Sequence, residues 1–418
     1  MTWLVLFEDQ RWRSLRPLTE LAPVPALVFG DSTLASRWRR AANDVAKGSR
    51  LLAIEARTQA MGSWREAPPS DPGPAESDDT VLVANAAALP GAWLTAAWQA
   101  GPSLWAAEGR IAGARLRFEA VAKGLGRGGD FEGFLAALGL RTVTAEARFL
   151  SWPWELMDGN PDALSEDLAG MAPRAQGELH RLAAVYEPER VSLGAGSRVD
   201  AYAVLDARGG PIQIGPDVTV LSHTVVQGPC VVGASSRLLG GFVGRSTIGP
   251  GCRVAGEVDS TVWQGWANKA HHGFVGHSVI GEWVNLGALT TTSDLKNNYG
   301  TVRVPVEGRE VESGLAKVGS FLGPHVKTGI GTLLPTGGSV GTGSNLFGGG
   351  RYAPRHVPAF GWWDGEVMRE HRLDRFLKTA QTAMARRGRP LAPADEAALR
   401  SWFESTREER CEWVGAAG

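Results

Sequence analysis

The stretch FVGRSTIGPGCRV, from Phe242 to Val254, decides the fold of this chain. An aliphatic residue recurs in it every six positions, as at Ile248 and Val254, and glycine often follows. The stretches VSLGAGSRV and IQIGPDVTV have the same texture. A period of six indicates a parallel β-helix, in which short strands turn aliphatic side chains into a narrow prism and glycines permit tight corners. The sequence therefore predicts hexapeptide repeats over residues 186–352.

Two irregularities interrupt this repeat. Val254 and Ile280 lie 26 residues apart, which is not a multiple of six, so the register slips between them. The segment Ser293–Gly314 is polar and is predicted to leave the prism as a loop. Because loops on a solenoid often carry its function, these irregularities are where a site is expected.

The first region, residues 1–185, has a different texture. Short apolar runs alternate in it with helical patterns, which is typical of an α/β layer structure. A surface loop rich in Pro, Ser and Asp is predicted over Glu66–Asp79. The expected elements are strands at Trp3–Phe7 and Thr80–Asn85 and helices at Asp31–Asn43, with Asp31 or Ser32 as the N-cap, and Ala92–Gln99.

The last region, residues 353–418, has few glycines. It predicts two amphipathic helices, Asp364–Arg386 and Ala394–Val414, separated by a proline-containing break. Such helices would cap the open end of the solenoid, which otherwise presents unpaired strand edges.

Composition excludes several classes of protein. The 418 residues carry a formal net charge of -1, which argues against nucleic acid and against a membrane surface as partners. Three cysteines are too few for a disulfide framework and favour a reducing, cytoplasmic location. The N-terminal residues do not read as a signal peptide, and no apolar run is long enough to span a membrane.

Two motifs carry a resemblance to a known family. The block NKAHHGFVGHSVIGEWVNLGALTTTSDLKN covers Asn268–Asn297, and LFEDQRWRSLRPLT covers Leu6–Thr19. Both resemble the GlmU-related group of sugar nucleotidyltransferases, whose bifunctional relatives make UDP-N-acetylglucosamine. The resemblance implies an α/β nucleotidyltransferase-like domain, a left-handed parallel β-helix with C-terminal α-helices, and a homotrimer. It also implies an acyl-CoA site between neighbouring solenoids.

The same block implies the residues of an acyltransferase site. His271 matches the family's general base, and a neutral imidazole with a pKa near ~6.5 suits that role. On strand geometry His271 and His272 would point in opposite directions, so only one could face the site. Asn285 matches the asparagine that contacts the amine-bearing part of the sugar. Ala288 stands where a backbone N–H holds the thioester carbonyl.

The block and the residues before it imply further contacts, and at some of these positions the chain differs from the family. Lys296 and Asn297 lie on the predicted exit loop and are expected to meet acetyl-CoA. Glu257 matches an acid near the sugar, whereas Phe274 replaces a tyrosine and Asp259 replaces a phosphate-binding lysine. Since one coil is about eighteen residues, Arg253 is expected one coil from His271 as a phosphate contact, with Arg237 and Arg245 as similar candidates.

The N-terminal motif is incomplete. LRPLT is kept, but EDQRWR replaces the Gly-rich loop whose N–H groups cradle nucleotide phosphates. Asn85 stands where the family has a metal-binding Asp, and Mg²⁺ prefers carboxylates. Arg11, Arg13 and Arg16 are candidates for binding the substrate in another way. Mg²⁺ is therefore expected only if this domain is active.

We expect an acyl-CoA-dependent N-acetyltransferase that acts on an amino-sugar phosphate resembling glucosamine-1-phosphate. Three alternatives stay open. The chain could also form UDP-N-acetylglucosamine from UTP, or be a non-catalytic trimeric scaffold. It could instead hold Zn²⁺ in a site like that of γ-carbonic anhydrases, with His272, His277 and His223 as candidate ligands. Ser236 and Val254, one or two coils back, are not metal ligands, so no metal is predicted.

Overall fold

A computed structural model of the chain describes residues 1–57 and 75–414. Most of the predicted loop Glu66–Asp79 lies outside these residues. The chain forms two compact units. No helix among the described residues is long and apolar enough to cross a membrane. Unit 1 comprises Met1–Leu15, Leu21–Leu27 and Ser32–Ser151, and unit 2 comprises Arg16–Glu20, Val28–Asp31 and Trp152–Gly418.

Unit 1 contains a six-stranded mixed sheet in the order β4-β1-β5-β7-β6-β8. β1 is parallel to β4 and β5, whereas β7 is antiparallel to β5 and β6. The sheet confirms the predicted α/β class, because apolar runs such as Val81–Val83 are buried between layers. The strands are β1 (Thr2–Phe7), β4 (Arg50–Glu55), β5 (Thr80–Asn85), β6 (Ser103–Ala107), β7 (Arg110–Arg117) and β8 (Thr142–Thr144).

The helices of unit 1 are α1 (Leu34–Val45), α2 (Ala92–Gln99), α3 (Phe118–Ala122) and α4 (Phe131–Ala137). The bounds of α2 are those predicted. The predicted start of α1 is wrong, because Thr33 is its N-cap: the Thr33 hydroxyl accepts a hydrogen bond from the Ser36 N–H at 3.1 Å. Thr33 thus accepts the hydrogen bond from a backbone N–H in the first turn of the helix, a role that Asp31 or Ser32 was expected to fill.

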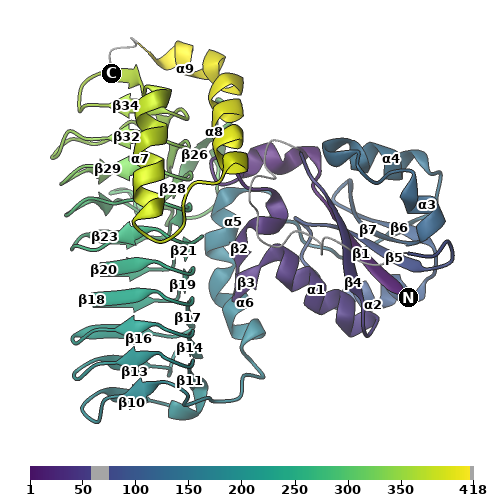
Figure 1. Cartoon of the computed structure of the whole chain (residues 1–418), viewed down its shortest axis with the longest axis horizontal. Helices are drawn as coiled ribbons and strands as arrows, with labels where there is room; N and C mark the ends of the chain where they lie inside the picture. Colours follow the sequence, from purple (N-terminus) through teal and green to yellow (C-terminus); the bar gives the residue numbers. More distant parts are fainter. Residues whose placement is uncertain (58–74, 415–418) are drawn as a thin grey trace. The chain divides into compact units, whose positions relative to one another are not determined.

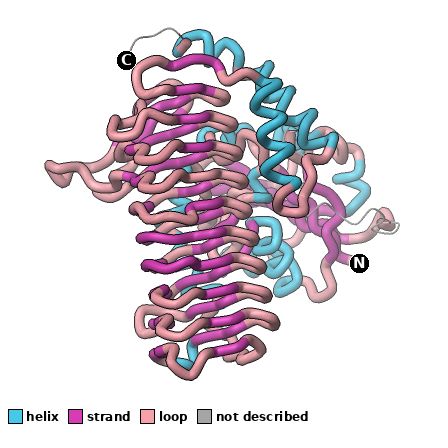
Figure 2. The backbone as a smooth tube through the Cα atoms, turned by 60° about the vertical axis from the view of Figure 1, so that its left-hand side comes forward, coloured by secondary structure: helices cyan, strands magenta, loops and turns pink. Residues whose placement is uncertain are grey.

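Unit 2 is dominated by a parallel β-solenoid, seen in Figures 1 and 2 as a stack of short strands. This confirms the predicted parallel β-helix. One face is a nine-stranded sheet. It contains β11 (Val191–Leu193), β14 (Ile212–Ile214), β17 (Cys230–Val232), β19 (Thr247–Ile248), β21 (Val262–Trp263), β24 (Val279–Ile280), β28 (Ser320–Leu322), β31 (Gly338–Val340) and β33 (His356–Val357).

Two further faces complete each coil, and β18 and β20 run through both. The second face contains β9 (Glu178–Leu179), β12 (Arg198–Val199), β15 (Thr219–Val220), β22 (Asn268–Lys269), β29 (Lys327–Thr328), β32 (Asn345–Leu346) and β34 (Gly361–Trp363). The third contains β10 (Ala184–Tyr186), β13 (Val204–Asp206), β16 (Thr224–Gln227), β23 (Phe274–Gly276), β25 (Thr291–Thr292) and β30 (Leu333–Leu334), beside the shared β18 (Arg237–Gly244) and β20 (Arg253–Asp259).

Inward aliphatic side chains form one column of core through the coils. Ile248 pairs with Trp263, which pairs with Ile280, and all three are fully buried. Removing such side chains from water drives the stacking, at about 25 cal/mol per Å² of apolar surface. The six-residue spacing of the sequence is therefore the spacing of inward positions on consecutive faces.

The predicted exit loop is a structured excursion rather than a simple polar loop. It contains the antiparallel strands β26 (Arg303–Val306) and β27 (Arg309–Glu312). Val302, Val304 and Val306 are buried, and β26 contacts β31 of the first face. Leu295 and Lys317 form an antiparallel bridge where the excursion leaves and returns.

The C-terminal helices differ from their predicted bounds. The expected helix Asp364–Arg386 is wrong at its start, because β35 (Met368–Glu370) pairs with β34 and α7 (Leu373–Ala385) begins later. The expected helix Ala394–Val414 is two helices, α8 (Pro393–Ser405) and α9 (Arg407–Trp413). α7 runs along the side of the solenoid (Figure 1) rather than across its end, and α9 contacts β35.

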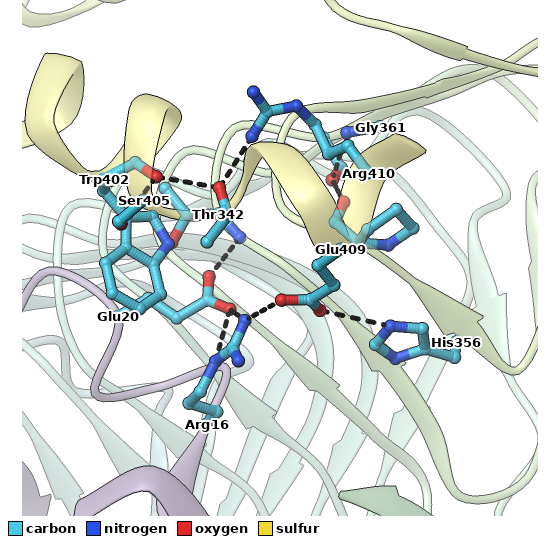
Figure 3. A network of polar contacts seen from close by, with 12 residues as sticks. Arg16, Glu20, Thr342, His356, Gly361, Trp402, Ser405, Glu409 and Arg410 are labelled. Atoms are coloured by element: carbon cyan, nitrogen blue, oxygen red, sulfur yellow. Dashed lines mark hydrogen bonds and ion pairs between the residues drawn. The ribbon is translucent and has the colours of Figure 1, made fainter. Parts of the chain in front are cut away.

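Two short segments from the start of the chain belong to unit 2. One of them, Arg16–Glu20, is bound by the C-terminal helices (Figure 3). Arg16 forms ion pairs with Glu20 at 3.1 Å and with Glu409 at 2.7 Å, and Glu20 accepts a hydrogen bond from the Thr342 N–H. Burial raises the pKa of Glu409, but His356 and Arg16 outweigh it and lower that pKa to about 2.

The second segment, Val28–Asp31, is held beside α5 (Pro153–Asp158) and α6 (Asn160–Asp167). The Gly30 N–H donates to the Asn160 side chain at 2.9 Å, and the Thr247 hydroxyl donates to the Gly30 carbonyl at 2.7 Å. These buried hydrogen bonds join three distant stretches of sequence to one face of the solenoid. The predicted division at residues 185 and 352 stays a prediction.

Candidate functional site

The corner between β22 and β23 carries His271 and His272. Both side chains are exposed, and neither residue lies in a strand. The expectation that they point in opposite directions rested on strand geometry and does not apply to a corner. The His272 carbonyl accepts a hydrogen bond from the Leu289 N–H at 2.8 Å, which ties this corner to the next coil.

A buried lysine holds the same corner from inside the prism. Lys269 is fully buried, and its ammonium donates to the carbonyls of His271 at 2.6 Å and His272 at 2.7 Å. Its partner in the preceding coil is Val254, an aliphatic inward residue. A lysine at an inward position of the repeat was therefore a sequence signal that we missed. Burying a charge is costly unless it is hydrogen-bonded, and the two carbonyls supply those bonds.

This burial predicts a pH-dependent stability. Desolvation lowers the pKa of Lys269 to about 8, whereas an unfolded lysine titrates near ~10.4. Between these values the unfolded chain holds the proton and the folded chain does not, so Lys269 stabilises the fold increasingly as pH rises. We expect the free energy of unfolding of Lys269→Met, relative to the natural chain, to fall by about 1.4 kcal/mol per pH unit over that window.

Urea unfolding of both proteins at several pH values from 7 to 10 measures this difference. Cys230 and Cys252 act in the opposite sense, since burial raises the pKa of each thiol to about 12, but they are common to both proteins and cancel. A difference that does not change with pH would show that the Lys269 ammonium is solvated.

Asn285 lies one coil beyond Asn268 on an outward position of the second face. Its side-chain oxygen accepts a hydrogen bond from the Asn268 amide at 2.8 Å. Asn285 is exposed. An asparagine amide can donate as well as accept, so its N–H groups are chemically suited to bind a ligand.

Ala288 follows on the same coil and is partly buried. Its carbonyl accepts from the Gly331 N–H at 2.8 Å. Over the part of the chain that the structure describes, the Ala288 N–H has no hydrogen-bond partner. A backbone donor of this kind is what an oxyanion requires.

Lys296 and Asn297 stand at the start of the excursion. The Lys296 ammonium donates to the Thr301 carbonyl and so closes a local turn, whereas Asn297 is exposed. Lys296 is therefore partly committed to the loop itself. The contact of both residues with acetyl-CoA stays a prediction.

The structure brings Glu257 and Phe274 together as register partners on adjacent coils of the third face. It does not place Arg253 below His271, because Arg253 pairs with Asn268, fifteen residues later. The residue below Gly273, which follows His272, is Gly256: an added Cβ there would lie 2.5 Å from the Gly273 carbonyl oxygen and 3.3 Å from the His272 Cα. The expected spacing of eighteen residues is wrong here because these coils are shorter.

Asp259, which replaces the family lysine, forms an ion pair with Arg245. The Arg245 Nε lies 3.1 Å from an Asp259 oxygen, and this hydrogen bond raises the pKa of Arg245. Arg245 is thereby committed to Asp259. Neither residue is left as a simple phosphate contact.

His277 occupies another corner, beyond β23, and pairs with Asp294 at 2.7 Å between Nδ1 and Oδ2. The sequence alone did not reveal this pair, whose members are 17 residues apart. β23 separates His277 from His272, so the zinc alternative has no geometric support. Residues 1–57 and 75–414 hold no group of three or more His, Cys, Asp or Glu side chains suited to a metal ion.

In unit 1, the carboxyl ends of β1, β4 and β5 meet at one edge of the sheet, where ligands bind in open α/β sheets. Buried ion pairs occupy this edge. Asp9 accepts hydrogen bonds from Arg110 Nε at 2.8 Å and from the Asn85 amide at 2.9 Å. Glu8 pairs with Arg57, whose guanidinium lies 3.7 Å from the Trp12 ring centroid.

These partners decide whether the edge suits Mg²⁺. Asn85 also donates to the Ile111 carbonyl at 3.1 Å and accepts from the Ala87 N–H at 3.0 Å, so its polar atoms are used within the fold. The carboxylates of Glu8 and Asp9 face arginines rather than open space. This donor set does not fit a Mg²⁺ ion, which needs free carboxylate oxygens.

The two predicted substrate-binding arginines have different surroundings and fall in different units. Arg13 is exposed, donates to the Gln10 side chain at 3.0 Å and lies over Trp12. Arg16 is held by Glu20 and Glu409, and these carboxylates raise its pKa although burial opposes them. Arg16 is therefore not available for a nucleotide.

Several known proteins share parts of this sequence. A bifunctional sugar-1-phosphate nucleotidylyltransferase/acetyltransferase of Sulfurisphaera tokodaii is 37% identical over 93 residues, which are 22% of this chain and 23% of that protein. A GlmU protein of Methanococcus vannielii is 30% identical over 131 residues, 31% of this chain and 27% of that protein. The chain thus spans about a quarter of the length of these curated relatives.

Among solved structures, a UDP-N-acetylglucosamine acyltransferase is 14% identical, with 59% of this chain and 94% of that chain covered at a TM-score of 0.23. A mutant of AntD, an N-acyltransferase from Bacillus cereus in complex with dTDP and coenzyme A, is also 14% identical. The match covers 49% of this chain and 90% of that chain, with a TM-score of 0.17. Residues 4–175 match the family model described as sugar nucleotidyl transferase. Residues 4–175 of this chain thus match the sugar nucleotidyl transferase family, and parts of the chain are similar to GlmU-type bifunctional proteins.

Proposed function

We propose that the chain is an acyl-CoA-dependent N-acyltransferase whose substrate is an amino-sugar phosphate and whose general base is His271. The observation that carries the proposal is the corner formed by His271 and His272. Two exposed imidazoles stand there on a backbone held by Lys269 from within and by Leu289 from the next coil. The acetyltransferase names of the relatives support the same activity.

In the proposed reaction the neutral imidazole of His271 accepts a proton from the substrate ammonium. The freed amine attacks the thioester carbonyl, so a C–N bond forms and the C–S bond breaks. The thiolate leaves and takes that proton from the imidazolium, and the amide nitrogen releases its remaining extra proton to water. The Ala288 N–H donates to the oxyanion, a contribution of about 3–4 kcal/mol in comparable sites.

The amide of Asn285 orients the amine-bearing part of the sugar in this proposal, and Glu257 and Phe274 contact the sugar ring. Lys296 and Asn297 meet the acetyl-CoA. A homotrimer would add a neighbouring solenoid to the site. Unit 1 is proposed to bind a ligand or to support the fold, and not to transfer nucleotides. The reason is that the carboxylates at its sheet edge are paired with arginines.

The test is thiol release from acetyl-CoA with glucosamine-1-phosphate, with and without UTP and Mg²⁺, while pyrophosphate is followed in parallel. We expect thiol release that needs neither UTP nor Mg²⁺, and no pyrophosphate. Pyrophosphate formation would overturn the role proposed for unit 1 and favour the bifunctional enzyme. Absence of thiol release with any of a panel of amino-sugar phosphates would favour the scaffold.

A further inference from the structure

Four arginines converge on one side of the solenoid without paired acids. We name Arg237, Arg253, Arg387 and Arg389 the arginine cluster. Arg237 and Arg253 are register partners on adjacent coils, and both side chains are exposed. Neighbouring parallel strands lie about 4.8 Å apart, so these two guanidinium groups can reach the same ligand.

The other two arginines come from the turn after α7. Arg387 donates a hydrogen bond to the carbonyl of Gly251, two residues before Arg253. Arg389 lies over the Trp266 ring, 4.6 Å from its centroid. An added Cβ on Gly251 would lie 2.6 Å from the same ring, so Trp266 covers Gly251 and both arginines belong to one neighbourhood.

Charge in this neighbourhood is unbalanced. None of the four arginines forms an ion pair with a carboxylate of the described residues. Glu282 is an acidic residue of this corner, next in sequence to Trp283, whose ring stacks on Trp266 at 5.4 Å. Burial lowers the pKa of Arg387, and the nearby positive charge of Arg253 lowers it further because the two guanidinium groups repel each other. Four guanidinium groups without a paired carboxylate among the described residues leave a positive charge that an anionic ligand would neutralise.

The cluster continues the column of Asn285. Arg253 pairs with Asn268, and Asn268 donates a hydrogen bond to Asn285. The distance along this column from Asn285 to Arg253 is two coils, about 10 Å, and to Arg237 about 14 Å. These distances are longer than the separation between the amine and the phosphate of an amino-sugar monophosphate. They suit an anion that lies farther from the amine.

We propose that the arginine cluster binds the diphosphate of a ligand used at the His271 corner. The inference rests on the proposed acyltransferase function and adds a ligand class to it. Two sources share this chemistry: the diphosphate of the acyl-CoA donor, and that of a nucleoside-diphosphate-linked amino sugar as acceptor. Each forked guanidinium group can donate two hydrogen bonds to phosphate oxygens. A monophosphate would therefore engage only some of these arginines, whereas a diphosphate can engage more of them.

Calorimetric titration of the full chain with inorganic pyrophosphate tests the proposal directly. We expect Arg389→Gln and Arg253→Gln each to weaken pyrophosphate binding roughly tenfold, since one charged hydrogen bond contributes about that factor. Arg386→Gln is the matched control, because Arg386 is exposed on the same turn but outside the cluster. Arg387 is left intact because it also anchors the turn to Gly251.

Competition identifies the source. Displacement of pyrophosphate by CoA assigns the cluster to the donor, and displacement by UDP assigns it to the acceptor. The proposal is overturned if the natural chain does not bind pyrophosphate at millimolar concentration, if neither ligand displaces it, or if Arg386→Gln weakens binding as much as Arg389→Gln. Because binding is read without turnover, pyrophosphate binding in the absence of thiol release would contradict the acyltransferase and leave the anion site standing.

Discussion

His271→Ala is expected to lower kcat for acyl transfer by a factor of about 10²–10⁴, the usual contribution of a positioned general base. KM for the amino sugar should change little, because the imidazole acts on the proton and not on the phosphate. The side chain is exposed, and the backbone of the corner is held by Lys269 and Leu289. The thermal midpoint of unfolding should therefore stay near that of the natural chain.

His272→Ala is the matched control for this prediction. His272 lies on the same corner, is also exposed and carries the same ring. Thiol release under saturating acetyl-CoA measures both variants. If His272→Ala loses activity and His271→Ala does not, the base is His272 and the assignment from the sequence block is wrong by one position. Equal, small losses in both would remove the corner from the proton transfer.

Asp9→Ala is expected to destabilise unit 1 by about 3–5 kcal/mol, the cost of leaving one member of a buried ion pair alone. Asp9 and Arg110 are 3% and 4% exposed, and both Arg110 Nε and the Asn85 amide donate to the same Asp9 oxygen. Without that carboxylate, a guanidinium against the Phe149 ring keeps its charge but loses its counterion.

Urea unfolding followed by tryptophan fluorescence measures this cost. Asp78→Ala is the control, because Asp78 pairs with Arg117 at the surface, where the two side chains are 81% and 70% exposed, and should cost under about 1 kcal/mol. The double variant Asp9→Ala with Arg110→Met should recover most of the loss, since no buried charge then remains. Equal costs for Asp9→Ala and Asp78→Ala would mean that water reaches the sheet edge.

The sequence predicted those elements that depend on local pattern. Thr80–Asn85 and Ala92–Gln99 have the predicted bounds because a short apolar run and a helical period are properties of neighbouring residues. The inward columns of the solenoid follow for the same reason. The start of α7 was wrong because β35 forms by pairing with β34, and the choice of strand over helix there depends on a partner strand and not on local period.

The candidate site was predictable only in part. His271, Asn285 and Ala288 came from a resemblance, and their neighbourhood depends on coil lengths that the six-residue period did not give. Lys269 was visible in principle as a charged residue in an inward position. The partners of Arg16 were not, because Glu409 is 393 positions away and no local pattern encodes such a pairing.

The discontinuity of unit 2 limits how this protein can be divided. Its polypeptide enters unit 2 at Arg16–Glu20, leaves it, enters again at Val28–Asp31 and joins it finally at Trp152. A chain that begins at residue 152 would lack the carboxylate that binds the Thr342 N–H and the carbonyl that binds the Thr247 hydroxyl. No single cut in the chain therefore separates the two units without removing these buried hydrogen bonds from unit 2.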